Sequence, residues 1–204
     1  MFPETIRTSR LDLRRVSAAV DVLDQYEYVS GTDTIEEETR YLSWEPHETP
    51  KETADVRATF EEAWEDAEAA VYALTPREGE DGAGAFAGTT GLHFDWDRRS
   101  AALGIWLRKP FWGRGYSGER AGALLDLAFD RLDLDLVSVE HQAGNEKSRR
   151  AVEKYVDRFG GRHEGVLRNG LESDDGPVDA HRYSIAQAEW REAVAADAPE
   201  VTYP

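Results

Sequence analysis

The chain has 204 residues, of which 40% are hydrophobic, and a formal net charge of −17 at pH 7. This length suits one globular domain, expected to span residues 1–204 with its core over about residues 5–190. The absence of cysteine excludes disulfides, thiolate metal sites and a cysteine nucleophile.

The charge is strongly acidic, with 41 Asp and Glu against 24 Lys and Arg. Such a surface repels phosphate backbones, so no nucleic-acid partner is expected. No apolar run is long enough for a bilayer and the charged start is unlike a signal peptide, which predicts a cytoplasmic protein without a membrane partner. We interpret the acidity as adaptation to a high-salt cytoplasm, as in a halophile, where self-repulsion is screened.

The first part of the chain predicts a strand followed by two helices. Thr5–Val16 alternates apolar and polar residues, as an edge strand does. Ser17–Val29 predicts a short helix, and the aromatic, Pro-rich stretch Tyr41–Pro50 predicts a loop. Thr49 as N-cap, with proline after it and a glutamate three residues on, predicts a second helix that ends at about Glu68.

Three antiparallel strands are expected next. Val71–Leu74 predicts a short strand, and Pro76–Gly84 a mobile, polar loop. Ala85–Phe94 and Ala101–Leu107 are typical of a hairpin joined by Asp95–Ser100.

The stretch after Leu107 changes character twice. Lys109 and Pro110 break the strand, a turn with three glycines runs from Trp112 to Gly118, and a helix with one apolar face follows. A helix N-terminus behind a glycine-rich turn offers free N–H groups and a positive dipole end, which suit a phosphate group. A chain that merely turns at these glycines is the alternative.

The last part predicts a strand over Leu136–Gln142 and a helix from Asn145 to the glycines at 160–161. Closing strands are expected over His163–Leu171 and Ala180–Ala186, with a turn at 172–177 between them. We expect a tail over Glu189–Pro204 that is helical and then frayed.

Trp112, Gly115 and Ser117 follow one another in an order that resembles the acyl-CoA signature of the GCN5-related N-acetyltransferase (GNAT) superfamily. The strand opening Thr5–Val16 is similar to that of its RimJ/RimL-like branch. The resemblance implies an α+β, three-layer GNAT fold, in which a mixed, mostly antiparallel sheet splays at a central V and is flanked by helices.

The resemblance also implies that acetyl-CoA is the cosubstrate and that no metal is needed. The backbone of Ile105, Trp106 and Leu107 would bind the pantetheine arm. The turn would wrap the diphosphate with Gly113, Arg114, Gly115, Tyr116, Ser117 and Gly118.

Basic residues concentrate around this turn. Between residues 108 and 150, eight Lys and Arg balance seven Asp and Glu within an otherwise acidic chain. The candidates for an anionic ligand are Arg108, Lys109, Arg114, Arg120, Lys147, Arg149 and Arg150, although each alone could be an ordinary solvated charge.

Asn145 and Ser148 resemble the family's Asn-x-x-Ser. By that resemblance both bind the pantetheine arm, and Ser148 lies near the thioester sulfur, where it could protonate the leaving thiolate. Both residues could equally be helix caps. Many relatives carry a tyrosine as general acid where this chain has Val152, and Tyr155 is expected in the core.

The general base is left open between His93 on one strand and Glu140 on another. His141 alternates with Glu140, so the two cannot share a face. Trp44, Pro46 and His47 resemble the segment that walls the acceptor site in RimJ/RimL-like enzymes.

These features predict an acetyl-CoA-dependent N-acetyltransferase that acts on a primary amine, preferentially a protein N-terminus. Acetylation of a small amine (aminoglycoside, polyamine or amino acid) and a non-catalytic acyl-CoA-binding module are the alternatives. A Rossmann protein is disfavoured because the turn lacks its glycine spacing. A monomer and a homodimer both stay open.

Overall fold

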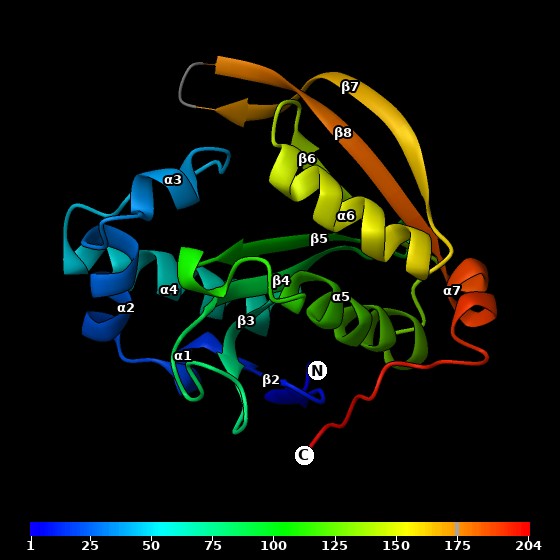
Figure 1. Ribbon diagram of the computed structural model, residues 1–204, viewed down its shortest axis with the longest axis horizontal. Helices are drawn as coiled ribbons and strands as arrows, with labels where there is room; N and C mark the ends of the chain where they lie inside the picture. Colours follow the sequence, from blue (N-terminus) through cyan, green and yellow to red (C-terminus); the bar gives the residue numbers. More distant parts are fainter. Residues whose placement is uncertain (174–175) are drawn as a thin grey trace.

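The computed structural model describes residues 1–173 and 176–204. Its strands form one mixed sheet in the order β1-β2-β3-β4-β5-β6-β8-β7 (Figure 1). Neighbouring strands are antiparallel except β5 and β6, which are parallel. This is the α+β architecture that the sequence predicted.

The elements are bounded as follows. The strands are β1 (Thr5–Arg7), β2 (Leu11–Arg15), β3 (Ala69–Pro76), β4 (Gly88–Asp95), β5 (Ser100–Leu107), β6 (Leu136–Gln142), β7 (Arg162–Ser173) and β8 (Gly176–Ala186). The helices are α1 (Val16–Ala19), α2 (Val22–Ser30), α3 (Ile35–Thr39), α4 (Pro50–Glu65), the 3₁₀ turn η1 (Lys109–Phe111), α5 (Tyr116–Asp126), the π turn η2 (Leu127–Arg131), α6 (Glu146–Arg158) and α7 (Gln187–Ala193). None of the described helices is long and apolar enough to cross a membrane.

Helices lie on both faces of the sheet (Figure 1). Because side chains alternate along a strand, Tyr72 packs into the larger core beside α5 and α6, whereas Val71 packs with residues of α1–α3. Helices α1–α4 pack on β2, β3 and the end of β5, and not on β6, β7 or β8 within the described ranges. One face of the sheet beyond β5 therefore has no helical cover.

The sheet splits between its two parallel strands. β5 pairs with β6 only from Ser100 to Ala102, opposite residues 136–138. On its other side β5 stays paired with β4 as far as Leu107. The two parallel strands therefore diverge after Ala102, and this opens the V that the resemblance implied.

The N-terminal strand was predicted as one element but forms a hairpin of two. The hydroxyl of Thr8 accepts a hydrogen bond from the backbone N–H of Leu11 at 2.9 Å and closes a turn between β1 and β2. A side-chain bond of this kind competes with continuous strand pairing. The alternation of apolar residues continues through the turn, so periodicity alone did not reveal it.

The helical segment after the hairpin also differs from the prediction. The helix expected over Ser17–Val29 is two pieces, α1 and α2, and Asp21 caps the second by accepting from the N–H of Leu23. The short helix α3 was not predicted. The start of α4 is as predicted, with Thr49 accepting from the N–H of Glu52.

The ends of the chain are held together. The tail was expected to fray, but Thr202 bridges to Arg7 of β1, and the Tyr203 hydroxyl donates to Asp126 of α5. The closing strands run further than expected, to Ser173 and from Gly176. Asp174 and Asp175 of the predicted turn lie outside the described residues.

Candidate active site

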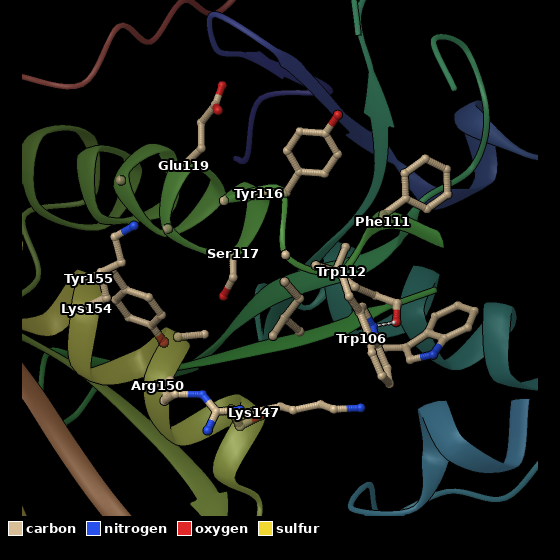
Figure 2. A pocket seen from close by; sticks show the side chains of 18 of the residues that line it. Trp106, Phe111, Trp112, Tyr116, Ser117, Glu119, Lys147, Arg150, Lys154 and Tyr155 are labelled. Carbon is tan, nitrogen blue, oxygen red and sulfur yellow. Dashed lines mark hydrogen bonds between the residues drawn. The ribbon is translucent and has the colours of Figure 1, made fainter. Parts of the chain in front are cut away.

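A cleft of about 1310 Å³ lies where β5 and β6 diverge (Figure 2). Its lining comes from the end of β5, the glycine-rich turn, the first turns of α5, one side of α6 along its length, α3, the β1–β2 turn and residues 197–200. The labelled side chains of Trp112, Ser117, Lys147, Arg150 and Tyr155 surround it in Figure 2. The two segments that the resemblance singled out, around residues 113–118 and 145–148, therefore line the same space.

The glycine-rich turn leads directly into α5. Gly115 is the N-cap of this helix with a φ of 82°, a left-handed conformation that glycine adopts without strain. A Cβ at Gly113, whose φ is 75°, would meet nothing within 4 Å, so the backbone there is open to a ligand. The first N–H groups of an α-helix have no partners within the helix, so the start of α5 has the geometry that suits an anion.

Residues far away in the sequence hold the turn in place. Arg10 in the β1–β2 turn donates to the carbonyl of Arg114 at 3.0 Å. Glu119 of α5 accepts from the backbone N–H of Arg10 at 2.8 Å and from its guanidinium. The loop that was expected to be mobile is tied to the same turn, because the Tyr116 hydroxyl donates to Glu80 at 2.7 Å.

Strand β5 presents its end to the cleft. Ile105 and Leu107 pack with the core beside α5, whereas Trp106 points to the other face and meets Trp44 edge-on at 5.3 Å between ring centroids. The carbonyl of Leu107 already accepts from Trp112 Nε1 at 2.7 Å (Figure 2). The N–H of Arg108 donates to the carbonyl of Ala87 on the β4 side, and successive residues of a strand direct their backbone groups to opposite edges. The backbone groups of Trp106 therefore also face β4, contrary to the expectation, whereas those of Ile105 and the N–H of Leu107 face the open edge and are placed to receive an extended ligand.

Asn145 is the N-cap of α6, and its side-chain oxygen accepts from the N–H of Ser148 at 3.1 Å. The capping alternative considered from the sequence is thus correct for Asn145. Ser148 is half-buried and lines the cleft. Its hydroxyl makes no side-chain hydrogen bond to the rest of the described chain, which leaves it available to a ligand.

The basic residues near the cleft fall into two groups. Lys109, Arg114, Lys147 and Arg149 form ion pairs with carboxylates, Arg108 stacks on Tyr28, and Arg120 is buried. Arg150 is exposed, lines the cleft and has no ion pair with any described residue. Lys154, one helical turn later, shares these properties and was not a candidate from the sequence, although its i, i+4 spacing from Arg150 could have suggested it.

Helix α3 joins two other elements at the mouth of the cleft through Glu37. This carboxylate pairs with Lys109 of η1 and, at 2.8 Å, with Lys147 of α6. The two hydrogen bonds lower the pKa of Glu37 to about 2. No local pattern in the sequence indicates this contact, because its partners lie 72 and 110 positions away.

Tyr155 lies in the core, as predicted. Burial raises the pKa of its hydroxyl and so keeps it neutral, and the buried guanidinium of Arg120 lies 5.5 Å from its ring centre. Val152 is also buried. Val152 has no proton to donate, and the Tyr155 hydroxyl is buried although the side chain lines the cleft.

The two candidates for the base lie on the same face of the sheet. His93 is opposite Ala102 of β5, and Ala102 is opposite Ser138 of β6, so the three side chains share the face away from α5 and α6. Glu140 follows two residues after Ser138 and points the same way. His141 points to the α6 side, where it stacks on Tyr183.

The two candidates differ in their distance from the split. His93 stands in the last row of paired residues, and partial desolvation lowers the pKa of its ring. Glu140 lies two residues beyond Ser138, just after the pairing between β5 and β6 ends. Its carboxylate accepts a hydrogen bond from Arg182 at 3.1 Å. Glu140 is therefore the nearer of the two to the open end of the V.

Comparisons with known proteins agree with this architecture. The family model described as "Acetyltransferase (GNAT) domain" matches residues 10–155. "Putative ribosomal N-acetyltransferase YdaF" of Bacillus subtilis is 35% identical over 108 residues, which cover 52% of this chain and 57% of that protein.

Two solved structures are similar over most of their length. A GCN5-related N-acetyltransferase from Brucella melitensis superposes with a TM-score of 0.76 at 19% identity, covering 96% of this chain and 84% of the other. Spermidine N-acetyltransferase from Vibrio cholerae, in complex with CoA and spermine, gives 0.68 at 19% identity, covering 89% and 98%.

The chain belongs to the GNAT family of acetyltransferases. The class of enzyme is therefore an acetyl-CoA-dependent N-acetyltransferase.

Proposed function

We propose that the protein transfers the acetyl group of acetyl-CoA to a primary amine, and that this amine is the α-amine of a protein N-terminus. The observation that carries the proposal is the split between β5 and β6, with a helix N-terminus on one side and an uncovered sheet face on the other. On that face, a Cβ at Gly104 would meet nothing within 4 Å. A chain end could therefore approach the split there. The similarity to YdaF supports the same acceptor class.

The residues of the cleft suit acetyl-CoA. The diphosphate would bind to the turn Gly113–Gly118 and the first N–H groups of α5. Backbone groups of Ile105 and the N–H of Leu107 would pair with the pantetheine amides, since the edge of β5 that faces away from β4 has no strand partner after Ala102. The unpaired cations of Arg150 and Lys154 would face the phosphates. Bound acetyl-CoA supplies an activated thioester.

The chain contributes proton transfer and positioning to the reaction. Glu140 takes one proton from the acceptor ammonium, and the free amine attacks the thioester carbonyl carbon. A C–N bond forms, the C–S bond breaks, and the sulfur leaves with the electron pair. The Ser148 hydroxyl donates a proton to this sulfur and regains one from the nitrogen, which completes the amide and a free thiol. His93, one row further from the split, is the alternative base.

We further propose that the enzyme works in a cytoplasm of high ionic strength. The net charge of −17 is the support, because salt at molar concentration screens charges beyond about 3 Å.

The test is thiol release from acetyl-CoA in about 2–3 M KCl, where surface charge is screened. N-terminal peptides of ribosomal proteins would be compared with spermine, an aminoglycoside and free amino acids. We expect turnover on the peptides. Turnover on small amines alone would refute the acceptor class, and CoA binding without turnover on any amine would refute the enzymatic proposal.

A further inference from the structure

A pair of opposite charges stands beside the split in the sheet. Arg182 of β8 is directly opposite Glu140 of β6, and its Nη1 donates to Glu140 Oε1 at 3.1 Å. Both side chains point to the face that no helix covers, on the same side as Gly104. Within residues 1–173 and 176–204, Glu140 is the only titratable residue of β5 and β6 on this face.

The guanidinium of Arg182 has N–H donors that the described residues do not use. It carries five N–H donors in a planar fork, and the bond to Glu140 is its one hydrogen bond to the described residues. Its side chain is 40% exposed, against 24% for Glu140. The pair therefore offers an incoming molecule a carboxylate oxygen and, next to it, free N–H donors.

This arrangement complements one kind of amine. In an aminoacyl unit the nitrogen is bonded to Cα and the carbonyl oxygen to the next carbon, so three bonds separate the two atoms and they lie roughly 3 Å apart. An ammonium at Glu140 would then place its neighbouring carbonyl oxygen beside Arg182. Polyamines and aminoglycosides have no such carbonyl.

We propose that Arg182 binds the carbonyl oxygen of the acceptor while Glu140 binds its ammonium, so that the site selects amines with a carbonyl on the adjacent carbon. This inference rests on the proposed function, and it names the group that would distinguish a peptide N-terminus from other amines. The surrounding charges are compatible, because the nearby carboxylate of Glu164 is held by the Ser184 hydroxyl. Arg182 thus has no second acidic partner among the described residues.

The test compares two acceptors of nearly equal shape, alaninamide and 2-aminobutane, in which an ethyl group replaces the carboxamide. Each is assayed by thiol release with the native protein and with Arg182→Met. We expect kcat/KM for alaninamide to fall at least roughly tenfold, the effect of losing one hydrogen bond from a charged donor. We expect the value for 2-aminobutane to fall less than about threefold. The different basicities of the amines cancel, because each is compared only with itself.

Two further variants separate binding from folding. Arg182→Lys keeps the charge and should restore part of the activity on alaninamide. Arg162→Met removes the arginine of another ion pair, formed by β7 with Glu189 of α7 and not with β6, and should leave the ratio of the two acceptors unchanged. Thermal unfolding of each variant checks that the fold is intact.

Equal losses on both acceptors, or no loss on either, would overturn the assignment of Arg182 while leaving the acetyltransferase proposal intact. If the native protein released no thiol with either amine or with N-terminal peptides, the proposed function would be refuted, and this inference with it.

Discussion

The cosubstrate side and the proposed acceptor side of the split in the sheet are built in different ways. On the cosubstrate side, the turn Gly113–Gly118 and α5 form one continuous stretch, and β5 precedes it directly. On the acceptor side, Glu140, Arg182 and Gly104 come from separate strands that meet only in the folded sheet. The first half depends on local backbone geometry, and the second on the register between strands. Substitutions should therefore separate loss of cosubstrate binding from loss of acceptor chemistry.

The largest effect is expected on the cosubstrate side, from Gly115→Glu. A side chain there requires a left-handed φ of 82° and places negative charge at the N-terminus of α5. We expect CoA affinity to fall by at least about 100-fold in a calorimetric titration. Gly176→Glu is the matched control, since Gly176 also has a positive φ, of 109°, but lies on the distant hairpin. Retained affinity in Gly115→Glu would remove the turn from the site.

Glu140→Gln should give the largest effect on the acceptor side. Loss of the proposed base is expected to lower kcat/KM for the amine roughly 100-fold, with CoA affinity unchanged. His93→Gln is the comparison, and we expect less than about a threefold change because His93 lies one row further from the split. The reverse order of effects would transfer the role of base to His93.

Ser148→Ala should have an intermediate effect, smaller than those of Gly115→Glu and Glu140→Gln. Its hydroxyl has no hydrogen-bond partner among the described side chains, so little stability is lost, but the leaving thiolate loses its proposed proton donor. We expect turnover to fall about tenfold while CoA affinity changes much less. Steady-state kinetics and a binding titration on the same variant decide this, and an unchanged rate would exclude Ser148 from the chemistry.

Arg150→Ala and Lys154→Ala should weaken the cosubstrate half mildly. Exposed cations contribute little each, so we expect CoA affinity to fall about two- to fivefold, and the difference to disappear as KCl rises. Arg149→Ala is the control on the same helix, because Arg149 is paired with Glu153 at 2.9 Å. An equal loss in that control would mean that only the general charge of α6 matters.

The effect of salt on stability is the smallest per charged group, and it becomes measurable only as the sum over the whole surface. The net charge of −17 predicts that the unfolding temperature rises between low and molar KCl as self-repulsion is screened. We expect a rise of about 5 °C, equivalent to roughly 1–2 kcal/mol for a domain of this size. Calorimetry at several salt concentrations measures it. A constant or falling midpoint would contradict adaptation to high salt.

The sequence predicted those parts of the molecule whose signals are local. Strand β6 was predicted with its observed bounds, and the start of α4 followed from Thr49 and Pro50. The glycine-rich turn could be recognised because backbone conformation and spacing are written in neighbouring residues. The caps of α6 were visible for the same reason.

The parts that were missed depend on distant contacts. Helix α3 is short, with Ile35 as its one apolar residue, and Glu37 forms its ion pairs with residues of η1 and α6. The hairpin at Thr8 depends on a side-chain hydrogen bond within an unbroken apolar pattern. The neighbourhood of Glu140 and Arg182 depends on the β6–β8 register, which a single sequence does not specify.

Acetyl-CoA is proposed to lie in the split between β5 and β6, with its diphosphate at the start of α5. Hydrogen–deuterium exchange of the whole protein, with and without acetyl-CoA at high salt, tests this placement. We expect slower exchange confined to residues 103–107, 113–118 and 145–148, with the β7–β8 hairpin unchanged. Binding that protects other segments and leaves residues 113–118 unchanged would contradict it.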